Sequence, residues 1–160
     1  MSFTDNVFGD NYMTYKSTWN DILKYIPKDK IIYEPFYGDG KSGEYLRELG
    51  CKNVIHEDID FFKNNFNYDL IISNPPFSKK KEILKKLYDI DKPFIILAPC
   101  MLLSYKYFQD NFKNKIQIII PSKRISFKHI CWRDNKKYSP PFSTFYFCYK
   151  MKLKNDIIFL

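Results

Sequence analysis

Asn74-Pro75-Pro76-Phe77 is the tetrapeptide whose residue types most clearly suggest chemistry in this chain. It follows a strand-like run, residues 68–73, whose centre is apolar. Proline fixes φ, lacks an N–H donor and restricts the residue before it, so the turn is stiff and presents the Asn74 side chain and nearby carbonyls as acceptors. Phe77 adds a flat apolar face. Such a turn can accept hydrogen bonds from a planar amino group while the ring stacks on the attached heterocycle. The alternative is a structural Pro-Pro turn with a core phenylalanine.

A second motif lies upstream. Residues 30–36 read as a buried strand, Tyr37-Gly38-Asp39-Gly40 as a glycine turn, and residues 41–49 as a short helix. Strand, glycine turn and helix are typical of the nucleotide-binding start of an α/β sheet, because glycines let the backbone approach a ligand closely. Asp39 would repel a pyrophosphate and suits a cation better. S-adenosylmethionine carries a sulfonium and an ammonium, so we expect Glu34 and Asp39 near it.

Together the two motifs resemble those of class I S-adenosylmethionine-dependent methyltransferases, specifically the amino-methyltransferases with an Asn-Pro-Pro-aromatic turn. Residues 34–40 are similar to their cofactor loop, Asp-Pro-Phe-x-Gly-x-Gly, with Glu34 in place of the commoner aspartate. Residues 74–77 are similar to their catalytic loop, and the resemblance spans most of the chain. It implies a Rossmann-like α/β fold, in which helices cover both faces of a mostly parallel sheet. It also implies S-adenosylmethionine as methyl donor and S-adenosylhomocysteine as product.

The resemblance also implies which residues hold the cofactor. Asp58 would bind the ribose hydroxyls, and Asp60-Phe61 would bracket the adenine. Only nine residues separate Asp58 from Tyr68, whereas a complete crossover takes about 10–12 residues or more. We therefore expect one β/α unit to be lost or shortened, and the choice of Asp58 against Glu57 or Asp60 stays open. The expected cofactor-binding residues are Thr14, Glu34, Phe36, Gly38, Asp39, Gly40, Asp58, Asp60, Phe61 and Asn74.

The implied reaction is direct methyl transfer to the exocyclic N6 of adenine. The lone pair of that nitrogen is delocalised into the ring, so it is a poor nucleophile. The Asn74 side-chain oxygen and the Pro75 carbonyl would accept its two hydrogens, and Phe77 would stack on the base. The expected catalytic residues are Asn74, Pro75, Pro76 and Phe77. Most of the catalysis would be positioning and oriented dipoles, with no metal.

The net charge of +8 predicts a polyanionic partner. Basic residues concentrate directly after the catalytic loop and again near residues 123–137, where Phe127, Trp132 and Tyr138 are interleaved. Lysine and arginine can contact phosphates while aromatic rings stack on bases. The expected nucleic-acid-binding residues are Lys79, Lys80, Lys81, Lys123, Arg124, Lys128, Trp132, Arg133, Lys136 and Lys137. A solvated charged face is the alternative for the first group.

Composition bounds the remaining possibilities. With 160 residues, 45% hydrophobic and 19% aromatic, the chain is expected to form a single catalytic domain over residues 1–160, without a separate target-recognition domain. No apolar run reaches the roughly 20 residues of a membrane span, so no membrane association is expected. Four scattered cysteines indicate free thiols in a reducing, cytoplasmic location. Abundant Lys, Asn and Ile suggest an AT-rich genome, and a viral source would place the protein in the host cytoplasm.

Regular elements are predicted elsewhere along the chain. We expect an amphipathic helix within residues 11–26 and a Thr14-containing turn before it. The expected later elements are helices to about residue 89 and over 105–111, strands over 53–57, 93–97 and 116–120, an antiparallel strand over 143–149, and a long substrate-side loop over 128–142.

Several alternatives remain from the sequence. DNA is favoured over RNA as substrate, but an RNA methyltransferase acting on adenine N6 or guanine N2 would carry the same loop. Glutamine side-chain methylation in proteins uses it as well, although a protein partner does not need the positive charge. A catalytically silent, nucleic-acid-binding subunit is the alternative from another class. A homodimer or a partner subunit could supply target recognition.

Overall fold

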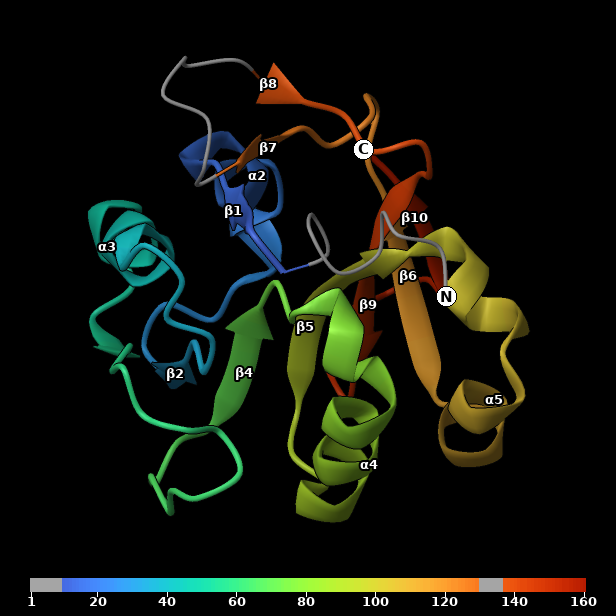
Figure 1. The fold of residues 1–160 in the computed structure, drawn as a ribbon, viewed down its shortest axis with the longest axis horizontal. Coiled ribbons are helices and arrows are strands. Elements are labelled where there is room, and N and C mark those ends of the chain that lie inside the picture. The colour runs from blue at the N-terminus through green and yellow to red at the C-terminus, as the bar shows by residue number, and fades with distance from the viewer. Residues whose placement is uncertain (1–9, 130–136) are drawn as a thin grey trace.

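The computed structural model describes residues 10–129 and 137–160. Within these ranges, seven strands form one sheet in the order β10-β6-β9-β5-β4-β2-β3 (Figure 1). Its strands are β2 (Ile31–Tyr33), β3 (Asn53–Ile55), β4 (Leu70–Ser73), β5 (Phe94–Pro99), β6 (Ile116–Ile120), β9 (Thr144–Tyr149) and β10 (Ile157–Phe159). Among the described strands of this sheet, β9 alone runs antiparallel to its neighbours. The predicted mostly parallel sheet with an antiparallel strand near residues 143–149 is confirmed, whereas β10 was not predicted.

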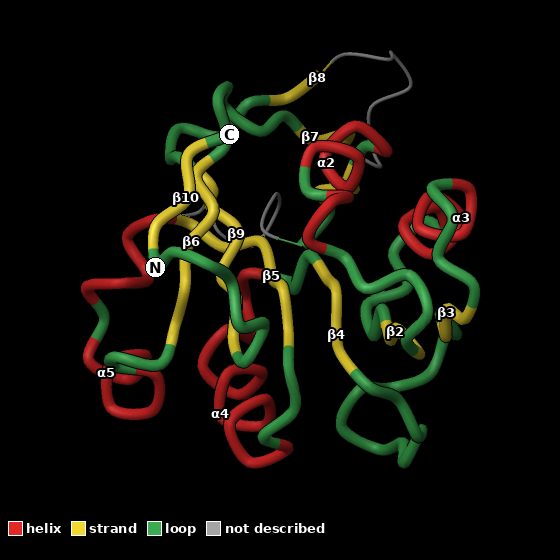
Figure 2. Tube along the Cα trace, turned by 180° about the vertical axis from the view of Figure 1, so that it is seen from behind, coloured by secondary structure: helices red, strands yellow, loops and turns green. Residues whose placement is uncertain are grey.

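Helices lie on both faces of the sheet, as predicted. The helices α4 (Lys80–Ile90) and α5 (Lys106–Phe112) pack on one face, and α2 (Lys16–Asp21) and α3 (Lys41–Glu48) on the other. Figure 2, turned by 180° from Figure 1, shows the molecule from the side of α2 and α3. Three short 3-10 turns adjoin these helices within the described residues: η1 (Leu23–Tyr25) follows α2, η2 (Phe77–Lys79) precedes α4 and η3 (Cys100–Ser104) precedes α5. The mostly parallel sheet between these two layers makes the fold Rossmann-like.

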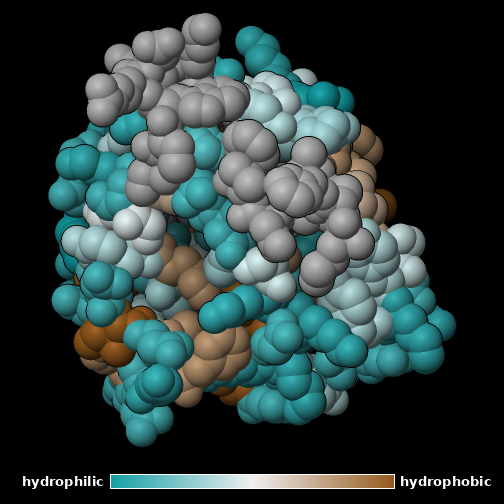
Figure 3. All heavy atoms as spheres, in the orientation of Figure 1, coloured by the Kyte–Doolittle hydropathy of each residue, from teal (hydrophilic) through white to brown (hydrophobic). Residues whose placement is uncertain are grey.

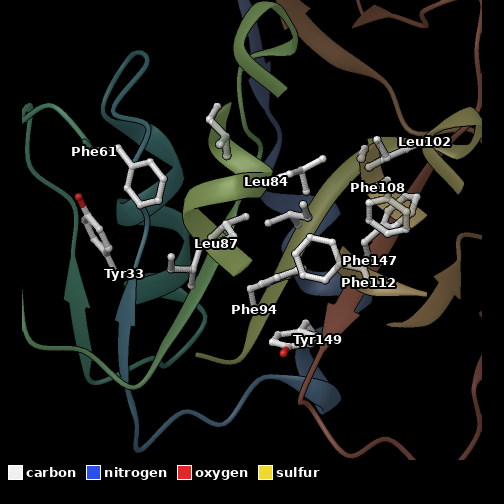
Figure 4. Close-up of a cluster of buried hydrophobic side chains, with 14 of the residues drawn as sticks. Tyr33, Phe61, Leu84, Leu87, Phe94, Leu102, Phe108, Phe112, Phe147 and Tyr149 are labelled. Atoms are coloured by element: carbon white, nitrogen blue, oxygen red, sulfur yellow. The ribbon is translucent and has the colours of Figure 1, made fainter. Parts of the chain in front are cut away.

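The core follows from the alternation of side chains along buried strands. In β5, Phe94 and Ile96 point to the α4 and α5 face, while Ile95 and Leu97 point to the α2 and α3 face, and all four are buried. Figure 4 shows the first cluster, in which α4 leucines lie between Phe61 and the aromatic group around Phe94. No helix in the described part of the chain has the length and apolar character needed to cross a bilayer.

A second, smaller sheet lies above the carboxyl edge of the main one (Figure 1). It has the order β1-β7-β8 and consists of β1 (Tyr12–Thr14), β7 (Phe127–His129) and β8 (Lys137–Tyr138). This sheet corrects two predictions. The residues around Thr14 form a strand rather than a turn, and β7 and β8 replace parts of the predicted 128–142 loop. Backbone pairing across more than 110 positions of sequence stabilises β1 in a way that local propensity cannot reveal.

The link between β3 and β4 is short, as the spacing predicted. Residues 56–69 contain neither a helix nor a strand, and β3 is the edge of the sheet. The chain leaves β2 toward β3 on one side and then returns to β4 on the other side of β2. In open parallel sheets, ligands bind outside the carboxyl ends of the strands where the order reverses in this way. The edge between β2 and β4 is therefore the place to look for a site.

Candidate functional site

A cavity of about 380 Å³ opens at this reversal of strand order. Figure 3 shows a hollow left of centre on the same face of the molecule, with apolar residues along its base. Both sequence motifs contribute to its walls, although they are about 40 residues apart. Of the predicted site residues, the following line the cavity: Thr14, Glu34, Phe36, Gly38, Asp39, Asp58, Asp60, Phe61, Asn74, Pro75, Pro76, Phe77 and Lys79.

The glycine turn after β2 forms one wall because its backbone adopts conformations that L side chains avoid. Gly38 and Gly40 have φ of +57° and +79°. A Cβ on Gly38 would lie 2.6 Å from the Met13 Sδ, which closes the turn from above. Gly40 does not line the cavity, and instead occupies the N-cap of α3. Its backbone N–H donates to the Tyr37 carbonyl at 2.9 Å, so it shapes the turn rather than facing a ligand.

Gly43 is a structural requirement that the sequence interpretation missed. A Cβ at this position would lie 2.4 Å from the His56 Cβ, so only glycine lets α3 pack this closely on the segment after β3. The spacing Gly38-x-Gly40-x-x-Gly43 was the available signal, because the third glycine of such a motif commonly permits close packing of helix on strand. His56 in turn contacts the Glu34 carbonyl through its Nδ1 at 3.0 Å.

Glu34 is buried at the centre of the site, with 1% of its surface exposed. The Ser42 hydroxyl donates to its Oε2 at 2.8 Å, and the Ser73 hydroxyl donates to its Oε1. The backbone N–H groups of Phe36 and Asn74 also donate to the carboxylate. Burial outweighs these hydrogen bonds and raises the pKa of Glu34 to about 7. The side chain therefore joins the ends of β2 and β4 to the start of α3.

Three more carboxylates line the same side of the cavity. Asp39 accepts the backbone N–H of Lys41 at 3.1 Å, and Asp60 accepts that of Phe62 at 2.8 Å. Asp58 also lines the cavity and is exposed. The resulting negative potential suits an ammonium group, and the free oxygens can accept hydrogen bonds from sugar hydroxyls. Asp58 and Asp60 both reach the cavity, so the structure does not separate these two candidates.

Aromatic rings form the adjoining wall. Phe36 and Phe61 pack edge to face with ring centroids 5.3 Å apart, and both line the cavity. Phe61 is fixed from behind by Lys86, whose Nζ lies 4.6 Å from the ring centroid and donates to the Phe61 carbonyl. Burial lowers the pKa of Lys86, whereas the nearby Asp60 raises it. An apolar wall beside carboxylates can hold a flat heterocycle attached to a sugar.

Asn74 follows the end of β4 and lines the cavity, and its carboxamide is held in one orientation. Its Nδ2 donates to the Tyr12 backbone carbonyl at 3.1 Å. Its Oδ1 is buried and has no hydrogen-bond partner in the described part of the chain. A buried acceptor left open in this way is unfavourable unless a ligand fills it, and such groups are concentrated at functional sites. The turn therefore carries one unpaired acceptor on a residue that lines the cavity.

Phe77 contributes an apolar face beside this acceptor. Its ring packs edge to face against Phe142 at 5.5 Å and against Tyr12 at 6.2 Å. The Lys80 Nζ lies 5.3 Å from the Phe77 centroid. Tyr12 also stacks on Tyr138 at 5.1 Å, which continues the aromatic surface into the small sheet. This side of the site is thus suited to a planar ring that carries an amino group.

The predicted nucleic-acid-binding residues fall in two places around the cavity. Lys79, Lys80 and Lys81 lie at the start of α4, and Lys79 lines the cavity itself. Lys128 and Lys137 are exposed and stand directly opposite each other in β7 and β8. Lys123 and Arg124 are exposed just before β7, and the Arg124 guanidinium donates to the Pro140 carbonyl at 3.4 Å. Trp132, Arg133 and Lys136 lie outside the described residues.

Sequence interpretation did not find Asp10, Ser42 or Ser73, and it included Tyr12 only in the predicted turn that contains Thr14. All but Ser73 line the cavity, and Ser73 reaches Glu34 from the end of β4. No motif marks Asp10 and Tyr12, because their contacts with residues 74–78 depend on how β1 crosses the end of β4 (Figure 1).

No protein-family model and no curated protein matches this chain. Among solved structures, a methyltransferase from Pyrococcus furiosus is similar to it over 93% of each chain, with 12% sequence identity and a TM-score of 0.40. A likeness this distant does not assign an activity.

Proposed function

We propose that this chain is an S-adenosylmethionine-dependent methyltransferase that acts on the exocyclic N6 of adenine in nucleic acid, with DNA favoured over RNA. The observation that carries the proposal is the Asn74 carboxamide. Its Oδ1 is buried and has no hydrogen-bond partner among the described residues, its Nδ2 donates to the Tyr12 carbonyl, and Asn74 and Phe77 both line the cavity. A planar aminated base satisfies both the open acceptor and the apolar face.

Other residues that line the cavity fit the methyl donor. Asp39, Asp58 and Asp60 supply negative charge and acceptor oxygens, and Phe61 belongs to the aromatic wall of the same cavity. S-adenosylmethionine presents an ammonium, a sulfonium, two ribose hydroxyls and an adenine, which are the groups these side chains can bind. When bound, it supplies an electrophilic methyl group. The cavity of about 380 Å³ is of the size that binds ligands of this class.

The protein's part in the reaction is orientation. Asn74 Oδ1 would accept one N6 hydrogen and the Pro75 carbonyl the other, which draws the nitrogen toward tetrahedral geometry and makes its lone pair available. Phe77 would hold the plane of the base so that N6 faces the donor side of the cavity. Placing two reactants in this way lowers the barrier without a covalent intermediate, because the loss of freedom has occurred on binding.

The positive charge supports a nucleic-acid substrate. Lys79, Lys81, Lys128 and Lys137 form no ion pair with a carboxylate among the described residues, whereas Lys85, Lys106 and Lys150 do. Lys128 and Lys137 are cross-strand neighbours of like charge, which is unfavourable in a free sheet. Phosphate groups would relieve that repulsion. A polypeptide glutamine fits the Asn74 acceptor but gives no reason for these charges.

Tritiated S-adenosylmethionine tests the proposal with the full chain. Single-stranded DNA, duplex DNA and structured RNA are offered in parallel and then digested to nucleosides. We expect label in N6-methyldeoxyadenosine. Label confined to RNA nucleosides would move the substrate to RNA, and label in glutamine of an added protein fraction would move it to polypeptides. Measurable binding of the donor without transfer to any acceptor would contradict the proposed activity.

A further inference from the structure

The orientation of the Asn74 carboxamide depends on one contact. Its oxygen and nitrogen ends are nearly equal in shape, so the turn alone accommodates either end toward the cavity. The Tyr12 carbonyl is an acceptor only, and it lies 3.1 Å from the Nδ2. Reversing the carboxamide would place two oxygen acceptors against each other and lose the hydrogen bond. The Tyr12 backbone therefore decides that the oxygen, and not the NH2 group, is the end of the Asn74 carboxamide that stays unpaired.

The same segment contacts the turn a second time. The Asp10 Oδ1 accepts the Ser78 backbone N–H at 3.0 Å, and its Oδ2 accepts the Ser78 hydroxyl. Ser78 lies in η2, four residues after Asn74. Asp10 and Tyr12 thus hold the two ends of the segment 74–78, which contains the two prolines and Phe77. Both contacts join parts of the chain that are more than 60 positions apart.

We propose that Asp10 is a positioning residue for the methyl-acceptor turn. It is two residues before Tyr12, and by anchoring to Ser78 it sets where the Tyr12 carbonyl meets Asn74. The inference rests on the proposed function and extends it to a residue outside both sequence motifs. Asp10 is exposed, and every hydrogen bond found for its side chain among the described residues goes to Ser78. Its contribution is thus to the turn rather than to the core.

Kinetic measurements separate positioning from a general structural role. In Asp10→Ala we expect kcat for the best nucleic-acid acceptor to fall about 10- to 100-fold, because displacement of about 1 Å in a positioning group has effects of this size. The dissociation constant for S-adenosylmethionine should change less than about twofold, and the midpoint of thermal unfolding less than about 2 °C. Ser78→Ala removes only the hydroxyl donor and should lower kcat less. The double variant should be no slower than Asp10→Ala, since both changes break one link.

Asp89→Ala is the matched control. Asp89 is an exposed aspartate in α4 that accepts from Lys85 at 2.6 Å, away from the turn. It should keep the kcat of the unaltered chain. A kcat for Asp10→Ala within about twofold of this control would overturn the inference, and so would a loss of kcat that follows an equal loss of donor binding.

Nitrogen-15 NMR of the ligand-free chain decides the point independently of activity. The Asn74 side-chain NH2 pair is identified by its disappearance in Asn74→Ala. In Asp10→Ala we expect this pair to shift and the Ser78 amide to exchange with solvent at least about tenfold faster, because both would lose their partners. An unchanged Asn74 pair would refute the positioning role. If the unaltered chain transfers no methyl group, the proposed function fails, and these spectra still test the link.

Discussion

The two sides of the cavity are built in different ways. On the side that we assign to the donor, most contacts are local, such as Asp39 with the backbone of Lys41, two residues away, and Glu34 with Ser42, eight residues away. On the acceptor side, Asn74 and Ser78 are held by residues 62 and 68 positions earlier. A short glycine turn shapes much of one ligand wall through neighbouring residues, whereas the direction of a single carboxamide needs a partner brought in by the fold.

Removing the Asn74 side-chain acceptor should have the largest effect on activity and should impair only the acceptor side of the cavity. In Asn74→Ala we expect kcat to fall at least about 100-fold, the usual effect of removing a preorganised polar group. Donor binding, measured by calorimetry, should remain within about twofold. Asn67→Ala, which changes an exposed asparagine before β4, is the control. Retained turnover in Asn74→Ala would show that the open Oδ1 is not the acceptor that matters.

Glu34 contacts residues on both the donor side and the acceptor side of the cavity. Because folding raises its pKa, the stability of the chain should depend on pH. Burial raises the pKa of Glu34 from 4.5 to about 7. Between pH 4.5 and about 7, Glu34 is therefore protonated in the folded chain and ionised in the unfolded chain. The associated stability is fully present below about pH 4.5 and is lost as pH rises through about 7, by roughly 3 kcal/mol. Urea unfolding at pH 5 and pH 7.5 should show this fall for the native sequence. Glu34→Gln should lose this dependence, and an unchanged slope would mean that other groups cause it.

Gly43→Ala should perturb the donor side while leaving the acceptor turn in place. The new Cβ would meet His56 at 2.4 Å, and overpacking of this kind destabilises by about 1–3 kcal/mol. We expect that loss in urea unfolding, together with weaker donor binding. Glu44→Ala, on the exposed face of α3, should change stability by less than about 1 kcal/mol. Equal stability of Gly43→Ala and Glu44→Ala would show that α3 can move away at little cost.

The smallest effect should come from the charges around the acceptor side. Replacing both Lys128 and Lys137 by alanine should weaken nucleic-acid binding about five- to tenfold and lower the slope of log K against log salt by about 1.4 for a single strand. The matched control replaces Lys85 and Lys106, which pair with Asp89 and Asp110 at 2.6 and 3.0 Å. Fluorescence anisotropy over a salt series measures both. Equal slopes in the two double variants would indicate a solvated charged face.

The two motifs and the strands before them were predictable because each depends on neighbouring residues. The run before Asn74, the strand over residues 116–120 and the helix after Gly40 lie close to where they were expected. The absence of a β/α unit between β3 and β4 was also predictable, because the segment between them is too short to hold another helix and strand. The strands β1, β7 and β8 were not, because they are short and polar in part, and long-range pairing stabilises them.

The residue types available for chemistry were readable in the order of the amino acids: an amide in a proline-stiffened turn, carboxylates near a glycine turn, and an excess of lysine. Side-chain direction was not, because it depends on contacts between segments that the sequence keeps far apart. Asn74 has an open oxygen rather than an open NH2 group because β1 places a carbonyl against it. Glu34 has a pKa near 7 rather than 4.5 because three elements bury it. Hydrogen-bond direction and desolvation arise only when the chain is folded, and they convert these residue types into a site.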